Sequence, residues 1–166
     1  LAGLKLKGEL AAYYGSFELP QRKYANRNHN LSLGEFRKPV PAEKLKTYPI
    51  ELLFVERFIQ LAKPGGWIAI ILPDGILSNS TLHYVREFIA EKTKVLAIVS
   101  LPRETFKQVG TSAKTSILVL RKYSSEENKD LDYKVFLVSI QKLDSKGFKE
   151  IVKSFEEFCN YRGTHN

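Results

Sequence analysis

The sequence of 166 residues contains no methionine, one cysteine and three histidines. A single cysteine, Cys159, excludes a disulfide bond within the chain. Its place near the end of an expected helix is typical of a half-buried structural residue rather than of a reactive thiol. This cysteine usage fits a cytoplasmic protein. Because the sequence starts at Leu1 without a methionine, we expect a processed or excised piece, or an incomplete record, of a longer chain.

Long hydrophobic runs are also missing. The longest apolar run covers residues 67–72, whereas a membrane-spanning helix needs roughly 20 residues. The amino terminus shows no secretory or transit signal. We therefore expect no membrane association.

Several motifs of common enzyme and cofactor sites do not occur. The three histidines, at positions 29, 83 and 165, are scattered and have no cysteine at ligand spacing, so we expect no metal site. The sequence has no G-x-S-x-G nucleophile elbow, no P-loop and no G-x-G-x-x-G turn. The pair Gly65-Gly66 follows an expected helix and precedes an expected strand, which is the wrong order for phosphate binding.

Positive charge is in excess, at 26 Lys and Arg against 18 Asp and Glu. Residues 1–50 carry nine basic and four acidic side chains, residues 51–100 are balanced, and residues 101–122 carry five basic and one acidic. A neutral framework with basic flanks favours contact with phosphate groups of a nucleic acid. Simple solubility remains the alternative explanation.

The pattern of apolar residues predicts an α/β fold. Strands that alternate with helices form a mainly parallel sheet with helices on both faces, and ligands bind at the carboxyl ends of its strands. Within residues 1–48, the sequence predicts a short helix at the start. A long basic loop is expected after it, because glycine, proline and asparagine residues interrupt this stretch. The helices are expected at 49–62, 81–91 and 148–158, and the strands at 67–72, 95–101, 115–120 and 133–140.

The loop 102–114 follows a strand and is the best candidate for a binding site. It places Phe106 among Arg103, Lys107 and Lys114. Basic groups can hold phosphates while an exposed aromatic ring stacks on a base. Alternatively, Phe106 packs in the core and the lysines are merely solvated.

Three blocks of sequence now point to a known family. They read ELLFVERFIQLAKPGGWIAIILPDGIL, LHYVREFIAEKTKVLAIVSLPRETF and GTSAKTSILVLRK, in this order within residues 49–122. This region resembles the carboxy-terminal half of the methyltransferase domain in modification subunits of type I restriction–modification systems, which are adenine-N6 DNA methyltransferases. The chain is then organised as a variable basic region (1–48), this half-domain (49–122) and an extension of one strand and one amphipathic helix (123–166).

The resemblance implies a partial Rossmann-like methyltransferase fold with S-adenosylmethionine as methyl donor. Phe54 matches the position that faces the adenine of this cofactor, although it could equally be a core residue. Phe106 matches a ring that stacks on the target adenine after this base is flipped out of the duplex. Arg103, Lys107 and Lys114 would then face DNA, and the partners would be the specificity and restriction subunits of a type I complex.

Two motifs that this family needs do not occur in the sequence. There is no F-x-G-x-G turn for the cofactor, and no Asn-Pro-Pro-Tyr or Asn-Pro-Pro-Phe motif for the adenine amino group. We therefore expect no catalytic residue in this chain and no methylation of DNA by the chain alone. An alternative is a non-catalytic domain with a degenerate methyltransferase fold that binds DNA or a partner subunit.

Overall fold

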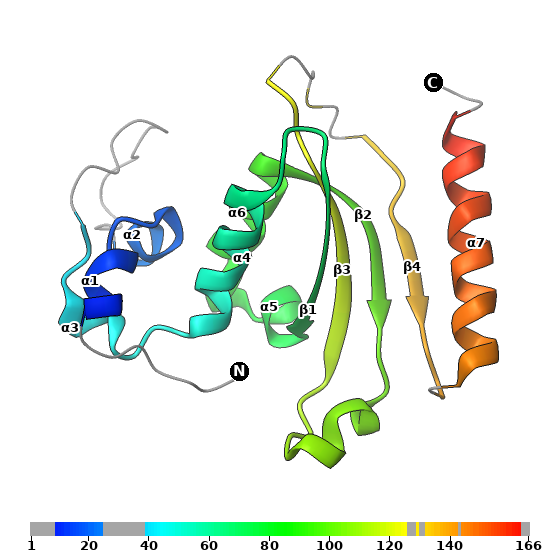
Figure 1. Cartoon of the computed structure of the whole chain (residues 1–166), viewed down its shortest axis with the longest axis horizontal. Coiled ribbons are helices and arrows are strands. Elements are labelled where there is room, and N and C mark those ends of the chain that lie inside the picture. The colour runs from blue at the N-terminus through cyan, green and yellow to red at the C-terminus, as the bar shows by residue number, and fades with distance from the viewer. Residues whose placement is uncertain (1–8, 25–38, 126–128, 130–131, 143, 164–166) are drawn as a thin grey trace. The chain divides into compact units, whose positions relative to one another are not determined.

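The computed structural model describes most of the chain, namely residues 9–24, 39–125, 129, 132–142 and 144–163. These residues form two compact units. Unit 1 comprises Leu1–Lys63 and Ile76–Thr93, and unit 2 comprises Pro64–Gly75 and Lys94–Asn166. Figure 1 labels their helices and strands.

In its described part, unit 1 consists of helices. They are α1 (Glu9–Tyr14), α2 (Glu18–Tyr24), α3 (Ala42–Leu45), α4 (Ile50–Leu61), α5 (Gly75–Ser78, whose first residue belongs to unit 2), the 3₁₀ helix η1 (Ser80–Leu82) and α6 (His83–Lys92). The short helix predicted at the start of the chain is confirmed by α1, whereas the loop predicted after it was wrong at α2 and α3. Helix α2 forms despite Pro20, because proline is tolerated in the first turn of a helix, and Leu19 is fully buried.

Helix α4 begins after Pro49 and ends before Pro64, as the sequence predicts. Its buried apolar residues include Leu52, Val55 and Ile59, at the spacing of one helical face. One charged residue is buried among them. The carboxylate of Glu56 accepts hydrogen bonds from the first backbone N–H groups of α2 and thereby caps that helix.

Helix α6 is linked to α2 by charge. Arg22 donates to Glu18 on its own helix and to Glu91 on α6, and its guanidinium lies 5.5 Å from the centre of the Phe88 ring. Asn79 caps the segment before α6, because its Oδ1 accepts the N–H of Thr81 at 2.9 Å. The capped segment is the short helix η1, which precedes α6.

Unit 2 contains one four-stranded sheet in the order β1-β3-β2-β4. Its strands are β1 (Trp67–Pro73), β2 (Thr93–Ser100), β3 (Thr115–Lys122) and β4 (Phe136–Ser139), with Thr93 itself counted in unit 1. The sequence predicted all four, although β4 is shorter than the expected 133–140. The 3₁₀ helix η2 (Arg103–Val109) lies between β2 and β3.

The predicted α/β sheet is present, but it is mixed, so its strands do not all pair in parallel. β2 and β4 are parallel, but β1 and β3 are antiparallel, with Trp67 opposite Arg121 and Pro73 opposite Thr115. Leu101, just after β2, donates its N–H to Thr115 at the start of β3. A parallel neighbour needs a long crossover, usually an α-helix. Residues 101–114, all described, contain only η2.

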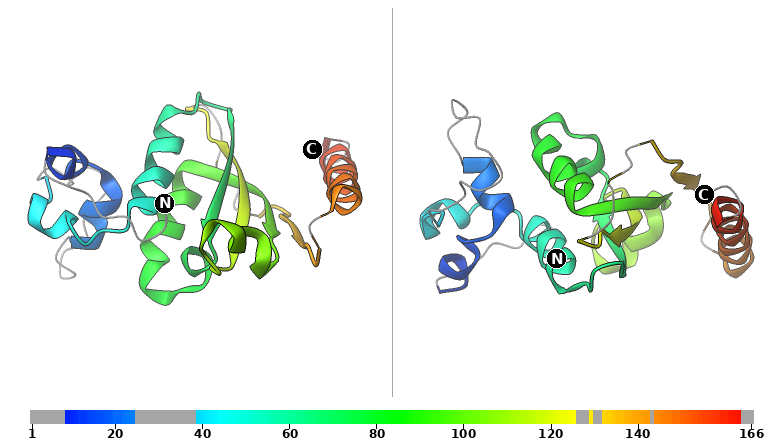
Figure 2. Two further views of the ribbon diagram at one scale, coloured as in Figure 1. Left: turned by 60° about the horizontal axis from the view of Figure 1, so that its bottom comes forward. Right: turned by 90° about the horizontal axis from the view of Figure 1, so that it is seen from above.

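Helix α7 (Ser145–Gly163) packs against this sheet and runs beside β4 in Figures 1 and 2. The ring of Phe155 lies 6.2 Å from that of Trp67 on β1 and 5.4 Å from that of Phe136 on β4. Ile151 packs against a buried cluster that includes Val99 and Ile140. The extension is thus part of the same compact unit as the sheet.

Candidate functional site

Three segments of unit 2 meet at one edge of its sheet. The turn after β1 is bonded to the start of β3, because Asp74 donates its N–H to the carbonyl of Lys114 at 2.9 Å. The hydroxyl of Ser116 donates to Asp74 Oδ1 at 2.8 Å. Since Leu101 also bonds to Thr115, the carboxyl ends of β1 and β2 lie together. This is the edge at which α/β sheets bind ligands.

The loop that contains η2 is held by its own hydrogen bonds. Thr105 donates both its N–H and its hydroxyl to the carbonyl of Pro102. The segment then kinks at Phe106 (φ −113°, ψ 15°) and ends at Gly110. Gly110 has φ +86°, a left-handed conformation that glycine adopts without strain, and its N–H bonds to Lys107. The loop is therefore held in a defined shape by its own hydrogen bonds.

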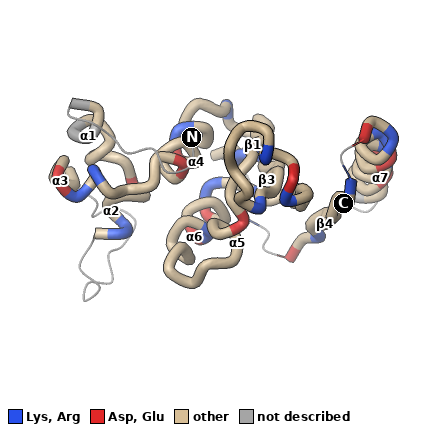
Figure 3. Tube along the Cα trace, turned by 90° about the horizontal axis from the view of Figure 1, so that it is seen from below, with Lys and Arg blue, Asp and Glu red and all other residues tan. Residues whose placement is uncertain are grey.

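The basic residues of this loop fall into two kinds. Arg103 and Lys107 are exposed, as the sequence interpretation required. Lys114 is half-buried, and its ammonium group donates a hydrogen bond to the carbonyl of Leu101. Lys114 thus closes the base of the loop, and its predicted contact with DNA stays a prediction. Figure 3 shows basic segments near β1 and β3, and others on α2, α6 and α7.

Phe106 is half-buried and packs against the cluster of Val99, Leu101 and Ile140. Part of the ring belongs to the core and part is open to solvent. Both hypotheses from the sequence, a ring packed in the core and a ring available for stacking, therefore have support. Its role in stacking on a base stays a prediction.

Phe54, the predicted cofactor contact, lies in unit 1 on α4 and is half-buried. Phe58 and Leu61 follow it at the spacing of one helical face, and both are exposed. Phe54 therefore lies toward the open side of α4 rather than in the middle of its buried face. An apolar side chain at such a position can form one wall of a pocket for a purine ring. The other part of a cofactor site, the glycine turn, has no counterpart in the sequence.

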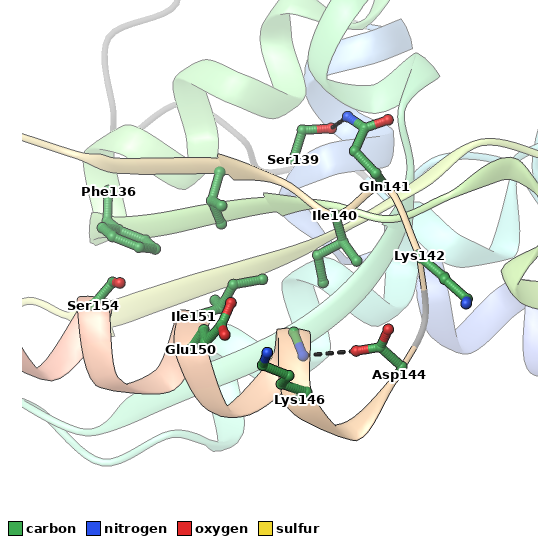
Figure 4. A pocket seen from close by; sticks show the side chains of 12 residues that line it. Phe136, Ser139, Ile140, Gln141, Lys142, Asp144, Lys146, Glu150, Ile151 and Ser154 are labelled. Carbon is green, nitrogen blue, oxygen red and sulfur yellow. Dashed lines mark hydrogen bonds between the residues drawn. The ribbon is translucent and has the colours of Figure 1, made fainter.

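A cavity of about 490 Å³ lies in unit 2 between β4 and the start of α7. Figure 4 shows Phe136, Ile140 and Ile151 forming its apolar wall, with charged side chains around the rim. Asp144 accepts the N–H of Gly147 and caps α7. The rim carries both lysines and carboxylates, and the cavity contains none of the predicted site residues.

The described part of the chain contains neither a group of metal ligands nor a helix that could span a membrane. No group of three or more His, Cys, Asp or Glu side chains there could hold a metal ion. None of the described helices is long and apolar enough to cross a membrane.

Sequence reasoning missed two features. It did not assign the bond between Asp74 and Ser116, because the two residues are far apart in the chain and meet only through the antiparallel pairing of β1 with β3. It also missed the capping role of Glu56. A glutamate at a core position of α4 was the available signal, since buried carboxylates need hydrogen-bond donors.

The fold defines the class of protein. The structure aligns over 65% of its length, with a TM-score of 0.53 and 27% identity, with a protein of Listeria monocytogenes assigned to the class I S-adenosylmethionine-dependent methyltransferases. It also aligns over 71% of its length, with a TM-score of 0.50 and 19% identity, with a modification subunit assigned to a type I restriction enzyme of Vibrio vulnificus YJ016. The predicted partial Rossmann-like methyltransferase fold is therefore confirmed.

A sequence profile of the N-6 DNA methylase family matches residues 21–161. The chain belongs to this family. It is also 33% identical over 73 residues to the defense against restriction protein B of Escherichia phage P1, a match that covers 44% of this chain and 3% of that protein. The chain spans 32% of the Listeria protein and 27% of the Vibrio subunit, so it corresponds to a minor part of each relative.

Proposed function

We propose that this chain forms part of an adenine-N6 DNA methyltransferase of a type I restriction–modification system. It would supply one wall of the cofactor pocket and a DNA-facing loop. S-adenosylmethionine would be the methyl donor, DNA the substrate, and specificity and restriction subunits the partners, in the cytoplasm.

The observation that carries the proposal is the η2 loop. A hydrogen-bonded loop presents the exposed Arg103 and Lys107, together with the partly open ring of Phe106, at the carboxyl edge of a methyltransferase sheet. Flexible basic tails bind phosphates as well, but a loop of fixed shape also sets the position of its aromatic ring. Positioning of base and donor is the main contribution of a protein to such a transfer.

S-adenosylmethionine supplies an activated methyl group. Of the residues in this chain, Phe54 fits a contact with its adenine, because it lies beside exposed apolar side chains on α4. Without a glycine turn and an Asn-Pro-Pro-aromatic motif, the chain would not complete the transfer. The family match over residues 21–161 favours this reading over a non-catalytic domain.

The test is transfer of a radiolabelled methyl group from S-adenosylmethionine to duplex DNA. We expect no transfer by the chain alone. We expect transfer when the chain is joined to, or mixed with, a polypeptide that carries the two missing motifs. Calorimetric titration with S-adenosylmethionine should give the same pattern. Methylation by the chain alone would overturn the assignment of the catalytic motif to another segment, and inactivity of the complete protein would overturn the proposed activity.

A further inference from the structure

Two lysines of unit 1 lie against the same tyrosine ring. Lys23, in the last turn of α2, has its Nζ 5.3 Å from the centre of the Tyr24 ring. Lys44, on α3, has its Nζ 5.5 Å from the same centre. Both lysines are exposed, and Figure 3 marks basic residues on both helices. Two helices thus bring two ammonium groups to one small surface.

The ring that both lysines contact is anchored to the core of unit 1. The hydroxyl of Tyr24 donates to the carbonyl of Lys44 at 3.0 Å, and its ring lies 6.4 Å from that of Tyr48. Tyr48 is fully buried, and its hydroxyl lies 3.3 Å from that of Tyr84 on α6. The Nζ of Lys23 also lies 5.1 Å from the centre of the Tyr48 ring. The buried tyrosines therefore help to fix the place of the ammonium groups.

No negative charge within the described part of the chain neutralises these two lysines. Neither of them forms an ion pair with a described carboxylate, whereas the neighbouring Lys46 pairs with Glu43 at 2.8 Å. Burial raises the pKa of Tyr48 and of Tyr84, so both phenols stay neutral at neutral pH. The surface around Tyr24 is therefore positively charged.

The chemistry of this surface suits phosphate groups. An ammonium group has three N–H donors, and its contact with the face of a ring is electrostatic, so donors remain for an anion. Lysine binds phosphate as a point charge. Consecutive phosphates of one DNA strand lie about 3.4 Å apart along the helix axis, so the two ammonium groups can reach neighbouring phosphates. Because the tyrosine rings restrict the two side chains in advance, less conformational entropy is lost on binding.

We infer that Lys23 and Lys44, ordered by Tyr24, bind the phosphate backbone of DNA. The inference rests on the proposed function and extends it, because the η2 loop belongs to unit 2 and this second contact belongs to unit 1. DNA is favoured over an acidic protein, since the chain belongs to the N-6 DNA methylase family. Contacts with phosphates carry no base information, so this contact strengthens binding without selecting a sequence.

The test is a salt titration of the affinity of the whole chain for a fluorescent DNA duplex, followed by fluorescence anisotropy. Lys23→Gln and Lys44→Gln should each reduce the slope of log K against log salt by about 1, and the double variant by about 2. The same reduction is expected with duplexes of unrelated sequence. Because both lysines are exposed, the variants should fold as the wild type does, which circular dichroism would verify.

The matched control is Lys46→Gln. Lys46 is exposed and close to Lys44 in the chain, so the change removes the same charge from the same region. Its Nζ, however, donates to both carboxylate oxygens of Glu43, at 2.9 and 2.8 Å. We expect the slope of this variant to stay within experimental error of the wild type. Equal slopes in the Lys46, Lys23 and Lys44 variants would overturn the site, because only total charge would then matter.

A second pair of variants tests the role of the ring without any change in charge. Tyr24→Leu removes the ring that both ammonium groups contact, so the lysines lose their order and affinity at fixed salt should fall by about threefold. Tyr24→Phe keeps the ring and should lose less. Wild-type affinity in a folded Tyr24→Leu variant would overturn the positioning role of Tyr24.

The remaining outcomes separate this inference from the proposed function. If the wild type binds the duplex and Lys107→Gln lowers the slope, but the Lys23 and Lys44 variants keep it, the unit 1 contact is overturned while the η2 contact stands. If the wild type does not bind duplex DNA, both fall. If poly-L-glutamate displaced the duplex as readily as a competing duplex of equal charge, the assignment of the unit 1 surface to DNA would be overturned.

Discussion

The carboxylate of Glu56 on α4 accepts the backbone N–H of Leu19 at 2.8 Å, and both residues are almost completely buried. Its other oxygen accepts the N–H of Glu18 at the same distance. A side chain on one helix thus caps another helix that lies far away in the sequence. The first turn of α2 depends on this single carboxylate.

Replacement of Glu56 by alanine should therefore loosen α2. A buried N–H group left without an acceptor costs roughly 1–3 kcal/mol. We expect a loss of that order in the free energy of unfolding and faster hydrogen exchange at Leu19. Glu56→Gln keeps one acceptor and should lose less. Unchanged exchange at Leu19 in the alanine variant would contradict the capping role.

The same carboxylate should make stability depend on pH. Burial raises the pKa of Glu56 above its usual value, although the hydrogen bonds from Leu19 and Glu18 oppose this. Because the pKa is higher in the folded chain, the stability that this group contributes is present below the unfolded pKa of about 4.3. It is lost as the pH rises through the folded pKa.

Urea unfolding of the wild type and Glu56→Gln between pH 4 and pH 7 would measure this dependence. The wild type should lose stability relative to the glutamine variant as the pH rises, since the variant has no group to titrate at this site. A difference that stays constant over this range would show that the pKa of Glu56 is not raised.

Phe106 has two roles to separate, packing and stacking. Phe106→Leu keeps an apolar side chain against Val99 and Leu101, so the variant should remain folded. It removes the ring, and base stacking contributes about 1–3 kcal/mol per base. We expect affinity for single-stranded DNA to fall by about fivefold or more. Equal affinity with an unchanged melting temperature would assign Phe106 to the core alone.

Lys107 and Lys114 should behave differently in salt titrations of DNA binding. Lys107 is exposed, so Lys107→Gln should reduce the slope of log K against log salt by about 1. Lys114 donates to Leu101, so Lys114→Gln should lower the melting temperature as well. A Lys107 variant with the wild-type slope would remove this residue from the DNA contact.

Trp67 reports on the packing of α7, because it is the sole tryptophan of the chain and lies edge-on to Phe155. Phe155→Ala should destabilise unit 2 by about 2–3 kcal/mol, which is less than the roughly 3–5 kcal/mol for a fully buried phenylalanine, because the ring is only half-buried. Val152→Ala, at an exposed position of the same helix, should change stability by less than about 0.5 kcal/mol. Equal effects, measured by Trp67 fluorescence during urea unfolding, would contradict this packing.

The sequence alone was sufficient to locate the helices and strands whose apolar residues recur with a strong period. Helix α4 and strands β1, β2 and β3 lie where the apolar pattern places them, because each buries a continuous apolar face. The pattern fails for α2, since seven residues with a proline carry no clear period, and the cap that stabilises this helix comes from Glu56. Local sequence cannot reveal a partner that tertiary packing supplies.

The sequence also did not predict how the strands pair, and part of the candidate site depends on this pairing. Strand periodicity says which residues are buried but not which neighbour a strand pairs with. Only the antiparallel register brings Ser116 to Asp74. By contrast, the exposure of Arg103 and Lys107 followed from their place in a polar loop. The ring of Phe106 could not be assigned, because its burial depends on Ile140, from a distant segment.

The division of the chain into units has a practical consequence for protein engineering. The backbone passes from one unit to the other after Lys63, after Gly75 and again after Thr93. No single cut can therefore release both units intact, because each unit is built from two separate segments of the chain. A cut after Lys63 divides unit 1, and a cut after Thr93 divides unit 2. A truncation from either end that passes Lys63 or Thr93 would remove pieces of both units, so individual substitutions are the better way to assign roles in this chain.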